Sequence, residues 1–171
     1  MQERNNVITM KGDALTLLGP ELKAGDPAPD FTGVNGDLSP FNYQAANGSV
    51  DVLVSVPSLD TDVCDMEVRR FNKEAASMQG VNVIVLSMDL PFAQQRWCGA
   101  KGVDNVQTLS DHKDADFGSG YGLLIKEARL LARAIVVVDG EGRIGYVQVV
   151  SELTNEPDYD AVLKAVQETA G

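Results

Sequence analysis

Residues 50–64, Val-Asp-Val-Leu-Val-Ser-Val-Pro-Ser-Leu-Asp-Thr-Asp-Val-Cys, join two stretches of different periodicity. Residues 50–56 are apolar and rich in β-branched side chains, which is typical of a buried strand. After them, apolar side chains recur with helical spacing, at Cys64, Val68, Phe71, Ala75 and Met78. The sequence therefore predicts a strand that leads directly into a helix ending near Gly80, with Cys64 in the first turn.

The start of a helix is a favourable place for a reactive cysteine. The first backbone N–H groups have no partners within the helix, and the helix dipole adds positive potential, so an anion such as a thiolate is stabilised there. Only about 3% of a thiol with the reference pKa of ~8.5 is ionised at pH 7, and making it mostly thiolate takes roughly 3.4 kcal/mol. A helix terminus supplies only ~0.3–2 kcal/mol. A nucleophilic Cys64 therefore needs a cation as well; the alternative is a small hydrophobic core residue. The residues that can cap this helix are Asp60, Thr61 and Asp62.

Arg133 is the first candidate for that cation. It lies among apolar residues directly before residues 134–138, a run that predicts another buried strand. Because burying an unpaired arginine is costly, Arg133 requires an anion as a partner. We expect this anion to be the thiolate of Cys64, with a surface carboxylate as the alternative. Arg96 is a second candidate for the cation.

The second cysteine, Cys98, lies near the end of a short predicted helix, residues 91–98, which we expect to stop at Gly99. Helix ends fray, so this position suits a cysteine that leaves its site to meet Cys64. A disulfide requires Cα atoms within about 7 Å, so we expect local unwinding of both helices. The alternative is that Cys98 simply packs beside Trp97.

Composition excludes several classes of function. The net charge of −11 argues against binding to nucleic acid or to an anionic membrane surface. No run of about 18 apolar residues predicts a membrane span, and residues 1–6 lack the apolar segment of a secretory signal, so a cytoplasmic location is expected. The two cysteines and the only histidine, His112, form no metal-ligand pattern, and we expect neither a metal nor a cofactor.

The remaining pattern predicts one α/β domain over residues 1–171, with a mixed sheet between helices. We expect strands, some in hairpins, at residues 7–10, 14–18, 31–38, 50–56, 81–87, 106–109, 134–138 and 144–150. Besides the helices that carry the cysteines, we expect a short helix or turn at residues 116–122 and a terminal helix at residues 158–169.

Pro57, Thr61 and Cys64 form the pattern P-x-x-x-T-x-x-C, which resembles the peroxiredoxins. The sequence PSLDTDVC is most similar to that of the thiol peroxidase subfamily of the peroxiredoxins. The stretches that extend this resemblance along the chain are residues 25–31, 89–100 and 156–159. The resemblance implies a thioredoxin-like fold with an N-terminal β-hairpin extension at residues 1–19.

The resemblance also implies a reaction, in which hydrogen peroxide or an organic hydroperoxide is reduced to water or an alcohol. In the implied scheme, Cys64 is the peroxidatic cysteine and Cys98 the resolving one, and the intramolecular disulfide between them is reduced by thioredoxin. Thr61 and Arg133 are expected to hold the peroxide, and Pro57 to limit water at the thiolate. A homodimer is implied, and no metal, haem or flavin.

Alternatives remain at this point. A redox-sensing interaction protein would use the same pair of cysteines to bind or release a partner. A general disulfide exchange protein is disfavoured, because Lys101 stands where a C-x-x-C motif would need a second cysteine. The sequence does not rank hydrogen peroxide against alkyl or lipid hydroperoxides.

Overall fold

The strand predicted at residues 50–56 lies inside a seven-stranded sheet in the computed structural model, which describes residues 1–171. The strands in spatial order are β10 (Ile144–Val149), β9 (Ala134–Val138), β5 (Val50–Ser55), β6 (Val81–Ser87), β7 (Gln107–Ser110), β3 (Phe31–Val34) and β4 (Pro40–Tyr43). β5, β6 and β7 are parallel, whereas β9 runs antiparallel to β5. The predicted α/β fold with a mixed sheet is confirmed.

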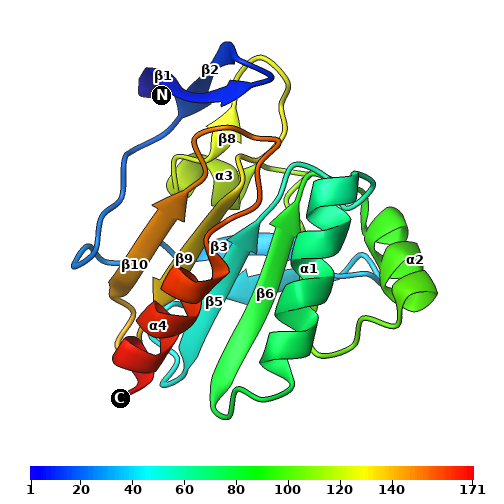
Figure 1. The fold of residues 1–171 in the computed structure, drawn as a ribbon, viewed down its shortest axis with the longest axis vertical. Coiled ribbons are helices and arrows are strands. Elements are labelled where there is room, and N and C mark those ends of the chain that lie inside the picture. The colour runs from blue at the N-terminus through cyan, green and yellow to red at the C-terminus, as the bar shows by residue number, and fades with distance from the viewer.

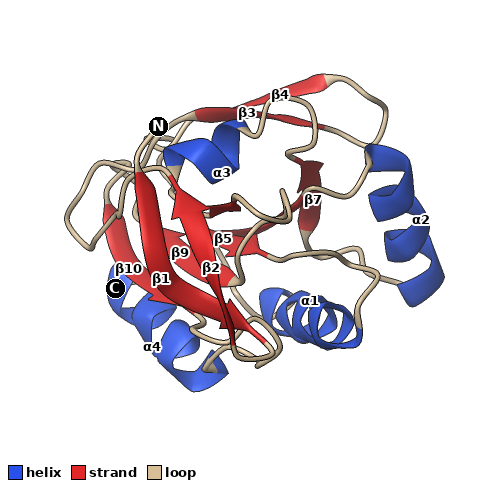
Figure 2. Ribbon diagram, turned by 90° about the horizontal axis from the view of Figure 1, so that it is seen from above, coloured by secondary structure: helices blue, strands red, loops and turns tan.

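Helices and a second, smaller sheet cover the two faces of this central sheet (Figures 1 and 2). One face carries α1 (Asp62–Ala75), α2 (Pro91–Lys101) and α4 (Tyr159–Ala170). The other face carries α3 (Asp116–Gly120) and a sheet of β1 (Glu3–Met10), β2 (Asp13–Leu18) and β8 (Leu124–Ile125). No helix is both long and apolar enough to cross a membrane.

Alternation along the central strands separates two hydrophobic clusters. In β5, Val52 and Val54 join the cluster under α1 and α4, whereas Leu53 points into the cluster on the opposite face. In β9, Ile135 and Val137 alternate in the same way with Val136. A strand covered on both faces needs apolar residues at successive positions, which explains the unbroken apolar runs in the sequence.

The parallel pair β5 and β6 brings the chemically important loops together. α1 is the crossover between the two strands, so their carboxyl ends lie at the same edge of the sheet. The loop after β5 therefore lies beside the loop after β6. Asp89 joins the loops, because its carboxylate accepts hydrogen bonds from Ser58 Oγ (2.7 Å) and from the backbone N–H of Leu59 (2.8 Å).

The N-terminal hairpin is confirmed and is longer than predicted: β1 and β2 pair antiparallel across Lys11 and Gly12. Both turn residues have positive φ (51° and 85°), as two-residue hairpin loops require. Strand β8 and the edge strand β4 were not predicted, since each is a short segment without a clear period.

Two predicted helix ends were wrong. α1 ends at Ala75 rather than near Gly80. α2 runs past Gly99 to Lys101 and stops at Gly102, which has φ 65°. The N–H of Val103 donates to the carbonyl of Cys98 (3.0 Å), which is the hydrogen bond of a Schellman motif with Gly102 in the left-handed position. The buried Val103 side chain supplies the hydrophobic contact of this motif, and an ending at Gly99 would lack that contact. Cys98 still lies in the last turn of the helix.

The position of the helix end predicts that alanine has opposite effects on the unfolding free energy at two glycines. Gly102→Ala should lower the free energy of unfolding by about 1 kcal/mol, because alanine is strained in the left-handed region. Gly99→Ala should raise it by roughly 0.5–1 kcal/mol, since Gly99 is inside the helix and an added Cβ meets no atom within 4 Å. Urea unfolding of both variants measures the two changes. Equal effects at the two positions would contradict the assigned helix end.

Candidate active site

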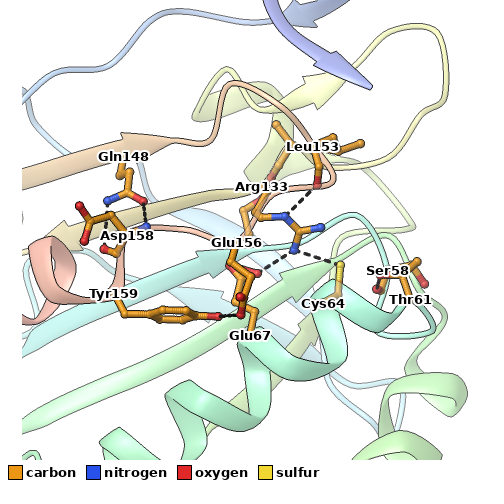
Figure 3. A network of polar contacts seen from close by, with 12 residues as sticks. Ser58, Thr61, Cys64, Glu67, Arg133, Gln148, Leu153, Glu156, Asp158 and Tyr159 are labelled. Carbon is orange, nitrogen blue, oxygen red and sulfur yellow. Dashed lines mark hydrogen bonds and ion pairs between the residues drawn. The ribbon is translucent and has the colours of Figure 1, made fainter. Parts of the chain in front are cut away.

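Cys64 lies in the first turn of α1, and its sulfur is hydrogen-bonded to Arg133 (Figure 3). Arg133 Nη1 donates to Cys64 Sγ at 3.3 Å, and the exposed fractions of the two residues are 2% and 0%. Cys64 thus lies on the apolar stripe of α1, as a core residue would, but its sulfur accepts a hydrogen bond from a buried cation. The structure thus brings the two residues into contact, and the role of Arg133 as the cation for a Cys64 thiolate stays a prediction.

The guanidinium of Arg133 is fixed by further partners. Its Nε donates to the carbonyl of Leu153 (3.0 Å), and its Nη1 also donates to Glu67 Oε2 (2.9 Å). Burial disfavours the charged form, yet the neighbouring Glu67 carboxylate and Cys64 sulfur hold the pKa of Arg133 above its ordinary value. A guanidinium tied down in this way presents a permanent positive charge to the sulfur.

Glu67 is a site residue that the sequence analysis missed. It follows Cys64 by three positions, on the same helix face, and is fully buried. Burial raises the pKa of Glu67 to about 7, although the charge of Arg133 opposes that shift. Its second oxygen, Oε1, has no hydrogen-bond partner. The available signal was a glutamate inside the stripe of Cys64, Val68 and Phe71, because a carboxylate buried there needs a cation as a partner or takes up a proton.

The loop before α1 leaves backbone amides free next to the sulfur. Thr61 is the N-cap residue, but its hydroxyl donates to the carbonyl of Ser58 (3.0 Å) rather than accepting from the helix. The first intrahelical donor is the N–H of Asp65 (2.9 Å to the Thr61 carbonyl), so the amides of residues 62–64 have no acceptor within α1. Pro57 is buried at the beginning of this loop.

Cys98 has a different environment from Cys64. It is half-buried in α2, and its Sγ lies 3.9 Å from Thr108 Oγ1 of β7. Burial raises the pKa of the Cys98 thiol, and the hydrogen bond with Thr108 opposes this shift. Both cysteines are free, and their sulfurs face different partners. The structure therefore shows no bond between Cys98 and Cys64, although both side chains pack in the same hydrophobic cluster.

A pocket of about 500 Å³ separates the loop before Cys64 from α2. Its lining residues are Ser58, Leu59, Asp60, Asp89, Ala93, Arg96, Trp97 and Ala100. Arg96, the second candidate for the cation, is exposed here and forms no ion pair.

The N-terminal hairpin supports Arg133 through the segment before α4. Thr9 of β1 donates its N–H to the Ser151 carbonyl and accepts from the N–H of Leu153, both at 2.8 Å. The Glu152 carboxylate reinforces this link by accepting from Thr9 Oγ1 (2.9 Å) and from the N–H of Gly12 (3.0 Å). Since the Leu153 carbonyl accepts from Arg133, the hairpin takes part in placing the guanidinium.

Comparison with known proteins gives a consistent result. The Redoxin family model matches residues 23–163. The chain is 54% identical to a thiol peroxidase from Oceanobacillus iheyensis, over 91% of this chain and 95% of that protein. It is 50% identical to a thiol peroxidase from Halalkalibacterium halodurans, over 94% and 96%. The crystal structure of a peroxiredoxin-like protein from Aquifex aeolicus superimposes with a TM-score of 0.91 and 45% identity, covering 97% of both chains.

The buried carboxyl predicts a pH-dependent stability. Glu67 has an ordinary pKa of 4.5, raised to about 7 by burial, so the folded protein holds this proton more tightly than the unfolded chain. The contribution of Glu67 to stability is therefore present below pH 4.5 and is lost as the pH rises through 7. Between pH 5 and 8 the parent should lose up to about 3 kcal/mol of unfolding free energy more than Glu67→Gln.

Urea unfolding at several pH values measures this difference. Glu74→Gln, a change on the same helix away from the site, is the control and should follow the parent. Parallel pH profiles for the parent and Glu67→Gln would show that Glu67 keeps its charge throughout.

Proposed function

The chain belongs to the Redoxin family as a thiol peroxidase of the peroxiredoxins, and from this we propose that Cys64 is the residue that attacks the hydroperoxide. The observation that carries the proposal is the hydrogen bond from buried Arg133 to Cys64 Sγ. A thioredoxin-like fold and peroxidase activity follow from the family.

In the first step, the Cys64 thiolate attacks the terminal oxygen of the hydroperoxide. An S–O bond forms and the O–O bond breaks, which oxidises the sulfur by two electrons and reduces the peroxide. Cys64 becomes a sulfenic acid, and the departing oxyanion takes a proton to leave as water or an alcohol. Arg133 supplies the cation that the helix terminus alone does not provide.

The surroundings of Cys64 fit a peroxide with its two oxygens. Because the Thr61 hydroxyl proton is used by the Ser58 carbonyl, the hydroxyl presents lone pairs, which suit the O–H of the incoming peroxide. The free amides of residues 62–64 and the Arg133 guanidinium suit the leaving oxyanion. We assign Pro57 the role of limiting water at the thiolate.

Glu67 sets how much of the Arg133 charge is available to the sulfur. Both groups bond the same nitrogen, Nη1, so an ionised Glu67 competes with the thiolate. With its pKa raised to about 7 by burial, the carboxyl is partly protonated at neutral pH, which leaves more of the charge for Cys64.

In the second step, the Cys98 thiol attacks the Cys64 sulfenic acid. An S–S bond forms, the S–O bond breaks, and water leaves. Since Cys98 faces Thr108 in the reduced protein, this step requires a rearrangement of the helices. Thioredoxin then reduces the disulfide by thiol–disulfide exchange, in the cytoplasm where such dithiols are kept reduced.

A homodimer is part of the proposal. Leu90 and Phe92 at the start of α2 are 53% and 62% exposed, and they lie in sequence between Asp89 and Ala93, which line the pocket. Apolar side chains exposed together are typical of an interface. The competing function, a redox-sensing interaction protein, uses the same disulfide but predicts no steady-state peroxide turnover with thioredoxin.

Thr61→Val should reduce the rate of peroxide consumption by roughly 10²-fold, the usual effect of removing one preorganised hydrogen bond at a reacting oxygen. Unfolding free energy should fall by no more than about 1 kcal/mol, because Thr61 is exposed and loses only its bond to Ser58. Single-turnover kinetics and thermal melts measure the two effects. Thr61→Ser, which keeps the hydroxyl, should retain most of the activity, and an active Thr61→Val would leave Thr61 as a structural residue only.

Cys98→Ser tests the second step. One equivalent of peroxide should still be consumed at near the parent rate, sulfenic acid should accumulate on Cys64, and excess peroxide should convert it to sulfinic acid. Thioredoxin-supported turnover, which the parent should show, should fall to the background rate because no intramolecular disulfide forms. Mass spectrometry and steady-state kinetics give the two readouts. A variant that cycles with thioredoxin at the parent rate would remove Cys98 from the mechanism.

A further inference from the structure

A residue next to Cys64 and a residue next to Cys98 form a hydrogen bond with each other. Asp65 follows Cys64 in α1, and Trp97 precedes Cys98 in α2. Trp97 Nε1 donates to Asp65 Oδ1 at 2.9 Å. The two helices that carry the cysteines are therefore connected by a side-chain hydrogen bond one residue away from each sulfur-bearing position.

This hydrogen bond is charge-assisted and partly shielded from solvent. The Asp65 side chain is only 19% exposed, and its carboxylate also pairs with Lys101 of α2 (3.6 Å) and with Arg69 of α1 (3.2 Å). Trp97 packs its ring against the hydrophobic cluster beneath α1. The indole has one N–H, so Trp97 is held to Asp65 by its single donor. Asp65 thus fixes α2 against α1 through Trp97 and Lys101.

In the docked arrangement the two sulfurs are free and contact different partners. Cys64 Sγ accepts from Arg133, whereas Cys98 Sγ lies against Thr108 of β7, on a different element. Both cysteines stand in regular helix, and a disulfide needs close Cα atoms with converging Cβ vectors. At least one of the two segments must therefore move to bring the sulfurs together. Movement of either segment displaces one partner of the Asp65–Trp97 hydrogen bond, and the pocket lined by Trp97 offers space for that movement.

We propose that the Asp65–Trp97 hydrogen bond is a latch that keeps α2 docked on α1 in the reduced protein and that must open before Cys98 reaches Cys64. Asp65 and Trp97 are positioning residues, since neither touches the peroxide. The inference rests on the proposed roles of the two cysteines. The Cys64 sulfenic acid has two fates: condensation with the Cys98 thiol, which releases water, or reaction with a second hydroperoxide, which yields sulfinic acid and water or an alcohol. A closed latch slows the first fate and so favours the second.

Asp65→Ala and Trp97→Phe, made separately in the full chain, test the latch. After one equivalent of hydrogen peroxide, acid quenching and mass spectrometry follow sulfenic acid and disulfide on Cys64 over time. Each variant should form the disulfide about tenfold faster than the parent or more, as expected from the loss of one hydrogen bond to a charged group. With rising peroxide concentration, each should also accumulate less sulfinic acid per turnover.

Two further variants sharpen the result. Asp65→Ala/Trp97→Phe should be no faster than the quicker single variant, because both changes break the same bond. Glu74→Gln breaks the ion pair of Glu74 with Arg70, which has the same i, i+4 spacing as that of Asp65 with Arg69 but does not involve α2. This variant should form the disulfide at the parent rate. If Asp65→Ala fails to fold, Trp97→Phe alone still reports on the latch.

Disulfide formation at the parent rate in both single variants, or slower formation in either, would overturn the latch. Additive acceleration in the double variant would overturn it as well, since the residues would then act independently. The proposed function fails in a distinguishable way, because in that case the parent itself forms no Cys64–Cys98 disulfide with one equivalent of peroxide.

Discussion

The hydrogen bonds of the buried Arg133 guanidinium are the interactions on which the rest of the site depends. One side chain bonds the Cys64 sulfur, the Glu67 carboxylate and the Leu153 carbonyl. Such a cation is stable in the protein interior only when its hydrogen bonds are satisfied, so the elements that carry these partners must all be in place. α1 supplies the sulfur and the carboxylate, and the segment before α4 supplies the carbonyl.

This requirement gives the N-terminal hairpin a part in the active site. Residues 1–22 lie outside the family match, yet Thr9 of the hairpin bonds Ser151 and Leu153, which places the carbonyl that receives Arg133. In addition, Asp89 fixes the loop before α1, and Asp65 connects α1 to α2. The elements around Cys64 are thus held by several contacts, whereas the Cys98 sulfur contacts Thr108.

Much of this arrangement was predictable, because strong local patterns encode it. The apolar runs at residues 50–56 and 134–138 predicted buried strands, and an arginine at the edge of such a run required an anion. Glu67 was missed because its place on the apolar stripe acquires meaning only with Arg133 opposite. The end of α2 was misplaced because Gly99 and Gly102 are equivalent by local rules, and the burial of Val103 decides between them. The link between Asp65 and Trp97 joins two helices, and no spacing within either one reveals it.

The hydrogen bond from Arg133 is expected to activate the Cys64 sulfur for attack, and the second-order rate of peroxide consumption in a single turnover measures this activation. The comparison uses Cys98→Ser as background, alone and combined with Arg133→Gln or Arg96→Gln. Arg133→Gln should lower this rate by roughly 10²-fold or more, because the cation beside the sulfur is lost. Arg96→Gln, which removes an exposed arginine of the pocket, should leave the rate unchanged. An equal rate for Arg133→Gln and its background would show that Arg133 does not activate Cys64.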